Sequence, residues 1–560
     1  MYNFSKTLMN KFKSLLLLAC FNSIISYGQW NISPTINTPV SIASKGQGDI
    51  HAAIDGNGGA ILAWDDNRSS ATNASDIYAQ RMDKNGKAKW AANGTAICTN
   101  AGNQKSVNII DAGNGSAIIT WEDERSGNLD IYAQKIDSNG ATLWAANGVA
   151  ITTKLTAQKN PKIINDNAGG AIIVWEDSVN FYYDIYAQRI NNSGTVQWTA
   201  NGIIVCNASN FQINAKLDID GAGGAIIAWQ DKRNNNDYDI YVQHLDASGS
   251  ALWKSNGVAI CTSINTQSNP RIEPDGSKGA VIAWVDKRNG ADYDVYAQQI
   301  NSSGKIGWTA NGVVICNASG NQSAIDLKYL GTTAAIVSWK DYRNNSYQIY
   351  SQMIDLQGKT LLTANGVLLS HGIQAINPNA ISAGQGAAII VWQDSTSAGW
   401  DIKSQKISKT GSIKNINTET TVCNAADDQI NATNASDGQG GAIFVWEDHR
   451  NATDYDVYTH HLDSSGLSNA PAYIKFPQIY KTFCYPNPII NGHTSLTVIS
   501  KNNPNQVVKI YNTLGSLLLI EKTDSEGKCM VNVSGLDNGI YYFKIESIDN
   551  STAGNFLIEK

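Results

Sequence analysis

The sequence is poor in charged residues and has no surplus of basic ones. Asp, Glu, Lys and Arg together make up 16% of the chain, where globular proteins usually have about a quarter. The formal net charge is −6. Domains that bind nucleic acid carry a basic surface, and this composition does not supply one. We therefore expect no nucleic-acid partner.

The sequence also lacks the motifs of several enzyme classes. No HExxH, GxSxG or P-loop pattern is present, and only 7 of the 560 residues are His. The spaced carboxylates of an EF-hand calcium loop are absent too. The neighbouring His460 and His461 do not replace them, because adjacent residues of a strand point to opposite faces. The sequence predicts no catalytic residue, no metal site and no cofactor.

Long apolar segments are missing after the N-terminal region. No later run reaches the roughly 18 apolar residues of a membrane helix, so we expect no transmembrane segment. The start reads as a signal peptide over residues 1–28, with three Lys before "SLLLLACFNSII" and small residues at Ser26 and Gly28. "LLAC", ending at Cys20, also resembles a lipoprotein box, and lipidation there stays open as the second alternative.

What the sequence does contain is a long internal repeat. The pattern Trp-x-Asp recurs at intervals of 53 to 57 residues, with the Trp at positions Trp64, Trp121, Trp175, Trp229, Trp284, Trp339, Trp392 and Trp446. A near-constant period of this length is typical of repeat architectures. The fold is therefore expected to be built from eight similar units.

Each unit contains short apolar runs between turn residues. One copy reads "DGAGGA", then "AIIAW", an Asn-rich loop, "DIYVQHL" and, after another turn, "VAICT". Runs of four to eight residues rich in β-branched and aromatic side chains predict strands, four per unit. No segment shows sustained helical periodicity. The predicted class is all-β.

The two ends of the repeat region are complementary. The last copy stops after "YDVYTHHLDSSG" without its outer strand, and a spare strand, "PVSIAS" at residues 39–44, precedes the first copy. Closing a ring of sheets removes their exposed edges. We predict an eight-bladed β-propeller over residues 30–468, closed by the N-terminal strand.

Several side chains recur with the repeat. An Arg follows the Trp-x-Asp by two residues in six copies, and another Asp opens the next strand in seven. We expect the Trp to be buried and these charges to pair around each loop. Eight equivalent carboxylates cannot all be one catalytic acid, so the interpretation is structural. A Gln before each innermost strand is interpreted as a clamp between blades, with a ring of amides at the channel mouth as the alternative. Five Cys at matching outer-strand positions are expected to be buried thiols.

The innermost strands vary most between copies. One position, expected to face the central channel, is filled in chain order by His51, Asn108, Lys162, Lys216, Arg271, Asp326, Asn379 and Thr433. Lys162, Lys216 and Arg271 would form a cationic arc on three consecutive blades. Solvated channel lining is the simpler interpretation, and the sharper hypothesis is an anion site at this arc.

The last hundred or so residues differ in character, since no Trp occurs after Trp446. They contain "YPNP" at 485–488, "VKIYNTLG" at 508–515, "GLDNGIYYFKI" at 535–545 and "NFLIEK" at 555–560. These motifs resemble the type A C-terminal sorting domain of the type IX secretion system, with Asp537 where the family often has Pro. We expect a linker over 469–482 and a small β-sandwich over 483–560. Cys484 and Cys529 could pair within it.

The resemblance implies Sec export and recognition by the type IX secretion machinery. It further implies removal of the domain and release or attachment at the outer cell surface. The repeats resemble extracellular bacterial β-propeller repeats, which names a fold and no activity, and they lack the S-x-D-x-G-x-T-W box of sialidase-like propellers. We favour binding or adhesion, with a glycan or another anionic surface as ligand. A polysaccharide-active glycosidase or lyase using Asp218, Glu273 and Asp326 is the alternative, and a structural surface role is the third.

Overall fold

The computed structural model describes residues 30–69, 74–179, 181–331, 334–413 and 419–468, and then 483–485, 489–490, 495–499, 506–512, 516–525, 528–546 and 551–559. The expected signal peptide, Cys20 and the expected linker lie outside the described residues. The chain divides into two compact units, residues 1–470 and 471–560.

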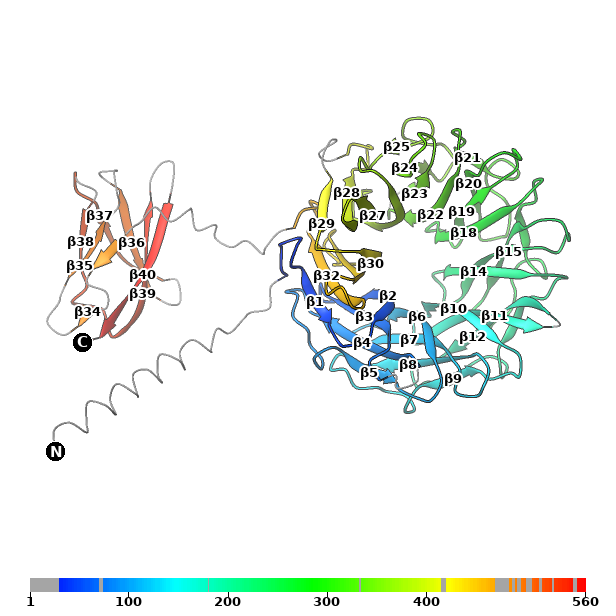
Figure 1. Cartoon of the computed structure of the whole chain (residues 1–560), viewed down its shortest axis with the longest axis horizontal. Coiled ribbons are helices and arrows are strands. Elements are labelled where there is room, and N and C mark those ends of the chain that lie inside the picture. The colour runs from blue at the N-terminus through cyan, green and yellow to red at the C-terminus, as the bar shows by residue number, and fades with distance from the viewer. Residues whose placement is uncertain are drawn as a thin grey trace. The chain divides into compact units, whose positions relative to one another are not determined.

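Every regular element of the described residues is a β-strand. The first unit holds eight four-stranded antiparallel sheets in a propeller-like arrangement (Figure 1). Across the part of the chain that the structure describes, no helix is long and apolar enough to cross a membrane. The all-β class predicted from the short strand patterns is therefore confirmed.

Each sheet contains an innermost, a second, a third and an outer strand. The innermost strands are β2 (Gln47–Ile54), β6 (Gln104–Asp111), β10 (Gln158–Asn165), β14 (Gln212–Ile219), β18 (Gln267–Pro274), β22 (Gln322–Tyr329), β26 (Ala375–Ser382) and β30 (Gln429–Ser436). The second strands are β3 (Ala60–Asp66), β7 (Ala117–Asp123), β11 (Ala171–Val179), β15 (Ala225–Asp231), β19 (Ala280–Asp286), β23 (Ala334–Asp341), β27 (Ala388–Thr396) and β31 (Ala442–Asp448).

The other two strands of each sheet lie farther out. The third strands are β4 (Asp76–Met82), β8 (Asp130–Ile136), β12 (Tyr182–Ile190), β16 (Asp239–Leu245), β20 (Asp294–Ile300), β24 (Gln348–Asp355), β28 (Gly399–Ile407) and β32 (Asp456–Leu462). The outer strands are β5 (Thr95–Cys98), β9 (Val149–Thr152), β13 (Ile203–Cys206), β17 (Val258–Cys261), β21 (Val313–Cys316), β25 (Val367–Leu368), β29 (Thr420–Cys423) and, in the eighth sheet, β1 (Thr38–Ser41).

The eighth sheet joins the two ends of the repeat region. β1 pairs antiparallel with β32, with Thr38 opposite Thr459, so the predicted pairing of the N-terminal strand with the last sheet is confirmed. The buried Asn37 side chain donates to the carbonyl of Val422 at 2.8 Å. The innermost strands β2 and β30, of the first and last sheets, are also in contact.

The second strands explain why Trp recurs. They are buried along most of their length because they lie between neighbouring sheets, and all eight Trp side chains are fully buried. One core cluster joins Ile172 of the third sheet to Trp229 of the fourth. Burying one such large apolar side chain contributes roughly 1.5–3 kcal/mol. The Trp thus recurs once per repeat because each sheet contributes one Trp to the apolar core between neighbouring sheets.

The predicted charge pairing around the loops is correct for the Asp of Trp-x-Asp and wrong for the Asp that opens the third strand. Asp231 accepts a hydrogen bond from Trp229 Nε1 at 2.8 Å and two from the Arg233 guanidinium, at 2.8 and 2.6 Å. Asp239, which opens the third strand, is held instead by the amide of Asn234 at 3.0 Å. The prediction that this second Asp pairs with Arg is wrong, because the guanidinium is already bound by the first.

In the third and seventh sheets a Lys from outside the loop takes the place of the missing Arg: Lys154 follows β9 of the second sheet, and Lys403 lies in β28 of the seventh. Lys154 lies 3.0 Å from Asp177, and Lys403 lies 2.7 Å from Asp394. The buried carboxylate therefore keeps a cation although the loop sequence lacks one.

The recurring Gln links neighbouring sheets through its main chain. The Gln267 main-chain N–H donates to the carbonyl of Tyr238 in the preceding sheet at 2.7 Å. Its side-chain amide donates to Asn265, in the loop just before it, at 2.9 Å. The side chain is buried, so neither the expected side-chain clamp nor a ring of amides at a channel mouth is correct.

The second unit holds a three-stranded and a five-stranded sheet around one core. Its strands are β33 (Phe483–Tyr485), β34 (Ile489–Ile490), β35 (Ser495–Ile499), β36 (Val507–Tyr511), β37 (Leu517–Lys522), β38 (Lys528–Asn532), β39 (Gly539–Glu546) and β40 (Ser551–Glu559). Leu496 of one sheet and Phe543 of the other share the core.

The cysteines are thiols where the structure describes them. Those of the outer strands, Cys98, Cys206, Cys261, Cys316 and Cys423, are free and buried, as predicted. Cys529 is also free. Cys484 and Cys529 flank Val498 from opposite strands, about two strand spacings or ~10 Å apart, which exceeds the ~7 Å reach of a disulfide.

Candidate functional site

A bulge in each innermost strand positions the variable residues. In β14 the register with β15 shifts between Ile213 and Lys216, and Asn214 has a positive φ of 60°. Asn tolerates this backbone region better than most residues, and bulges re-aim the side chains that follow. The same shift precedes Lys162 in β10 and Arg271 in β18.

The middle residue of Trp-x-Asp caps the bulge of the next sheet. Glu176 Oε1 accepts the Asn214 N–H at 2.7 Å, and Glu122 Oε1 accepts the Asn160 N–H at 2.7 Å. The residues that make this contact are Asp65, Glu122, Glu176, Gln230, Gln393 and Glu447. Sequence analysis missed this role, although the acceptor side chain at this position was a visible signal.

The position after the bulge faces the middle of the first unit. Arg271 lines a cavity of about 490 Å³ together with His51, Asn379 and Thr433, which hold the same position on other innermost strands. Lys162 and Lys216 are half-buried at that position of β10 and β14. The three cations predicted to form an arc thus occupy equivalent positions on consecutive innermost strands.

The charges of the arc act on one another. Burial, followed by the like charges of Arg271 and Lys162, lowers the pKa of Lys216 to about 7, while the negative charge of Glu176 opposes the shift. Burial also lowers the pKa of Lys162, and the negative charge of Asp49 opposes this. Arg271 lies 3.9 Å from Asp326, whereas Lys216 has no ion pair in the described part of the chain. Lys216 is therefore the cation least compensated by the protein.

A group of carboxyls lies next to the arc. Burial raises the pKa of Asp218 to about 7, and the negative charge of Glu273 adds to the shift. Glu273 lies 2.7 Å from Lys328 and accepts the Tyr329 N–H at 3.1 Å. The structure thus brings Asp218 and Glu273 together, with Lys328 beside them.

The third predicted carboxyl, Asp326, is engaged differently. It accepts the Ala380 N–H at 2.7 Å and faces Arg271, and burial raises its pKa. Asp326 belongs to the boundary between the cationic arc and the carboxyl group rather than to the Asp218–Glu273 pair.

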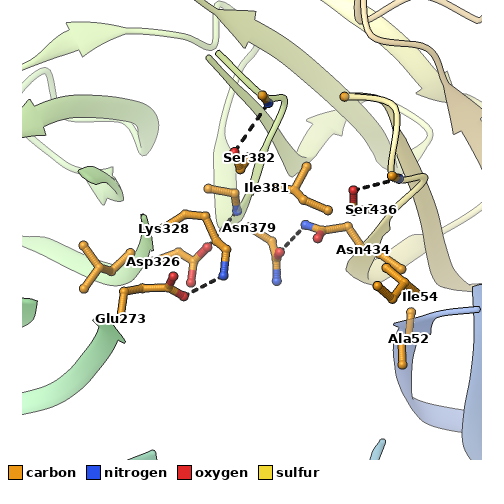
Figure 2. Close-up of a pocket in the computed structure, with 17 residues that line it drawn as sticks. Ala52, Ile54, Glu273, Asp326, Lys328, Asn379, Ile381, Ser382, Asn434 and Ser436 are labelled. Atoms are coloured by element: carbon orange, nitrogen blue, oxygen red, sulfur yellow. Dashed lines mark hydrogen bonds and ion pairs between the residues drawn. The ribbon is translucent and has the colours of Figure 1, made fainter. Parts of the chain in front are cut away.

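Glu273, Asp326 and Lys328 line a second cavity, of about 630 Å³ (Figure 2). On its other side Asn434 donates to Asn379. The lining contains apolar side chains such as Ile54 and Ile381 as well as polar ones such as Asn379, so the cavity suits a ligand with both kinds of surface. Among the residues that the structure describes, no group of three or more His, Cys, Asp or Glu is arranged to hold a metal ion.

The first unit is a propeller-like, all-β scaffold with a charged centre, and the second has its own identity. Residues 484–559 match the family model described as a secretion system C-terminal sorting domain. The resemblance to a type IX sorting domain is thereby confirmed. The domain marks this chain for export to the outer cell surface, where it is attached or released.

Several solved structures are similar to this chain at low sequence identity and low TM-score. PorZ, a surface component of the type IX secretion system of Porphyromonas gingivalis, has 12% identity and a TM-score of 0.36, covering 91% of this chain and 70% of its own. An ulvan lyase has 8% identity and a TM-score of 0.38, with 76% and 96% covered. The α-L-arabinanase of Penicillium chrysogenum has 11% identity and a TM-score of 0.32, with 65% and 94% covered. At such low similarity they assign no activity. No curated protein matches the chain.

Proposed function

We propose that this chain is a cell-surface binding protein that holds an anionic ligand at Lys162, Lys216 and Arg271 without converting it. The binding region is a closed eight-bladed β-propeller over residues 30–468. A signal peptide over 1–28 and a β-sandwich sorting domain over 483–560, joined by a linker over 469–482, deliver it to the surface.

One observation carries the proposal. Three cations hold the same bulge-directed position on consecutive innermost strands, and within the described residues neither Lys162 nor Lys216 has an ion pair. Holding like charges together in a partly buried site costs free energy. A carboxylate or sulfate placed between them removes that cost and adds charge-assisted hydrogen bonds.

The test is an array of sulfated, carboxylated and neutral oligosaccharides probed with the full chain. Capture of charged members, lost in Lys216→Glu by at least about thirtyfold in affinity, supports the proposal. Lys254→Glu makes the same charge change at an exposed lysine and should leave capture unchanged. Equal capture by wild type and Lys216→Glu, or no capture of any charged member, would contradict the arc.

The Asp218–Glu273 pair favours a second candidate, cleavage of a polysaccharide. Burial raises the pKa of both carboxyls, that of Asp218 to about 7 together with the charge of Glu273, while Lys328 beside Glu273 favours the ionised form of that group. Two carboxyls with separated protonation states are the arrangement that glycoside cleavage requires. New reducing ends released by wild type and not by Asp218→Asn would establish this function instead. If the array shows no capture and no reducing ends are released, the structural role is favoured.

A further inference from the structure

The first unit carries a row of aromatic side chains that the arc does not explain. In six consecutive sheets, the third to the eighth, an aromatic residue stands near the start of the third strand. It comes immediately before the recurring Asp, which is replaced by Gln348 in the sixth sheet. These residues, here called the aromatic rim, are Tyr183, Tyr238, Tyr293, Tyr347, Trp400 and Tyr455. All six are half-exposed. The first two sheets have Ser75 and Leu129 instead, so the rim is a continuous arc with two ends.

The rim lies at the end of the sheets where the innermost strands begin. The Tyr238 carbonyl accepts the main-chain N–H of Gln267, the first residue of β18, at 2.7 Å. Tyr293 is tied to Gln322 in the same way, also at 2.7 Å. Arg271 follows Gln267 by four residues, which is roughly 13 Å along a strand. The rim and the cationic arc therefore border one surface.

Lysines accompany four of the rim residues. Lys159, Lys232, Lys287 and Lys340 lie 3.8, 5.7, 5.2 and 4.3 Å from the ring centroids of Tyr183, Tyr238, Tyr293 and Tyr347. Lys159 is 3.8 Å from Glu176. Within the described ranges the other three form no ion pair with a carboxylate.

The acids of the same loops are already occupied. Asp237 accepts from Asn234 at 2.8 Å, and Asp292 accepts from Asn289 at 2.6 Å. These amides hold the carboxylates within their own loops. A ligand at the rim of the fourth, fifth and sixth sheets would therefore meet an aromatic ring and an ammonium without a carboxylate partner, repeated from one sheet to the next.

We infer that the aromatic rim and its lysines bind an acidic polysaccharide, whose chain runs along the rim and whose charged groups reach the arc. Half-exposed Tyr and Trp offer an apolar face beside a polar edge, which suits the C–H face and the hydroxyls of a sugar ring. Carboxylates or sulfates on the sugars complement the lysines. A repeated site suits a repeated ligand, because each further contact is made at a high effective concentration. This inference rests on the proposed function and names the ligand class of the same surface.

The experiment compares polygalacturonate with its methyl ester, which has the same backbone without the charges, and with tetragalacturonate. Full chain should bind the acid polymer at least about tenfold more tightly than the tetramer, and more tightly than the ester. Replacing two rim residues, Tyr238→Ala with Tyr293→Ala, should remove the advantage of the polymer and leave tetramer binding at the arc. The same positions changed to Phe should retain it. Tyr542→Ala, at an exposed tyrosine of the sorting domain, is the matched control.

The outcomes separate the two proposals. If Lys216→Glu abolishes binding of the tetramer but not of the polymer, and the Ala variants lose the polymer's advantage but still bind the tetramer, both sites are real and independent. If the Ala variants bind polymer as wild type does, or if the ester binds as tightly as the acid, the rim inference is wrong while the arc can still stand. If Lys216→Glu leaves tetramer binding unchanged, the arc proposal fails and the rim is judged by the Ala variants alone.

Discussion

At the scale of single residues, buried Asp side chains in this protein have two different kinds of hydrogen-bond partner. The Asp of Trp-x-Asp gains a guanidinium or an ammonium and serves as an anion, as Asp231 does with Arg233. The Asp that opens the third strand gains only neutral donors. Asp239 Oδ1 and Gln267 Oε1 are both buried and receive no hydrogen bond from the described residues. Gln267 is bonded through its main chain to the residue before Asp239. Protonation gives the Asp239 carboxyl a donor and removes the charge that burial disfavours.

This arrangement predicts that stability falls as pH rises towards neutrality. Burial raises the pKa of Asp239 to about 7, and the charges of Asp237 and Asp231 add to the shift, while Arg233 opposes it. The pKa of Asp184, Asp294, Asp401 and Asp456 is raised to about 6. A pKa raised on folding contributes stability below the unfolded-state value of about 4, and this is lost as pH passes the folded value. We expect the free energy of unfolding in urea to decrease between about pH 5 and pH 8.

Asp239→Asn isolates one of these groups. The amide carries no charge at any pH, so this variant should show a shallower decrease than wild type across the same range. The lowered pKa of Lys216 acts in the opposite direction above pH 7, but it is common to both proteins and cancels in the comparison. Parallel curves for wild type and variant would show that Asp239 is not the source.

At the scale of elements, the sequence predicted the strands well and the contacts between sheets poorly. The number, order and burial of the strands could be predicted because local apolar runs such as "AIIVW" determine which residues form a strand within one sheet. The bulge cap was missed because Glu176 contacts Asn214, 38 residues later and in another sheet. The lysines that replace Arg in the third and seventh sheets were missed for a different reason, because Lys154 precedes Asp177 by 23 residues and Lys403 follows Asp394 by nine, both outside the Trp-x-Asp-x-Arg spacing. The cationic arc could be predicted because equivalent repeat positions must lie side by side.

The cap can be tested by comparing two changes at one residue. Glu176 is buried and accepts the Asn214 N–H, and the fourth sheet uses Gln230 for the same contact. Glu176→Gln should therefore change the free energy of unfolding by less than about 1 kcal/mol. Glu176→Ala leaves the N–H of the bulge unpaired and should cost about 1–3 kcal/mol. Equal effects of the two changes in chemical denaturation would argue against a capping role.

At the scale of the whole molecule, the account depends on β1 completing the eighth sheet. Trp30 and Val40 are buried in the core that β1 shares with the first and last sheets. Trp30 also stacks on His461, with ring centroids 5.7 Å apart. His461 in turn lies 2.9 Å from Asp437. Residues separated by most of the chain therefore hold the ends of the repeat together.

Removal of residues 30–46 should lower the stability of the first unit markedly. Loss of Trp30 and Val40 alone costs about 3–6 kcal/mol of apolar burial, and the edge of β32 becomes unpaired. Ile36→Ala, at an exposed position of the same segment, should change little. If the truncated protein melted at the same temperature as wild type, closure by the N-terminal strand would not contribute to the fold.

Lys216 is proposed to be a poorly compensated cation that binds an anion, and titration of its own ammonium group tests this most directly. NMR of the lysine side chains, assigned with Lys216→Arg, would follow Lys216 in the full chain with and without tetragalacturonate. The account predicts a pKa near 7 without ligand and a clear rise when the ligand binds, because the anion stabilises the charged form. A Lys216 pKa at its ordinary value of 10.5, unchanged by saturating ligand, would contradict it.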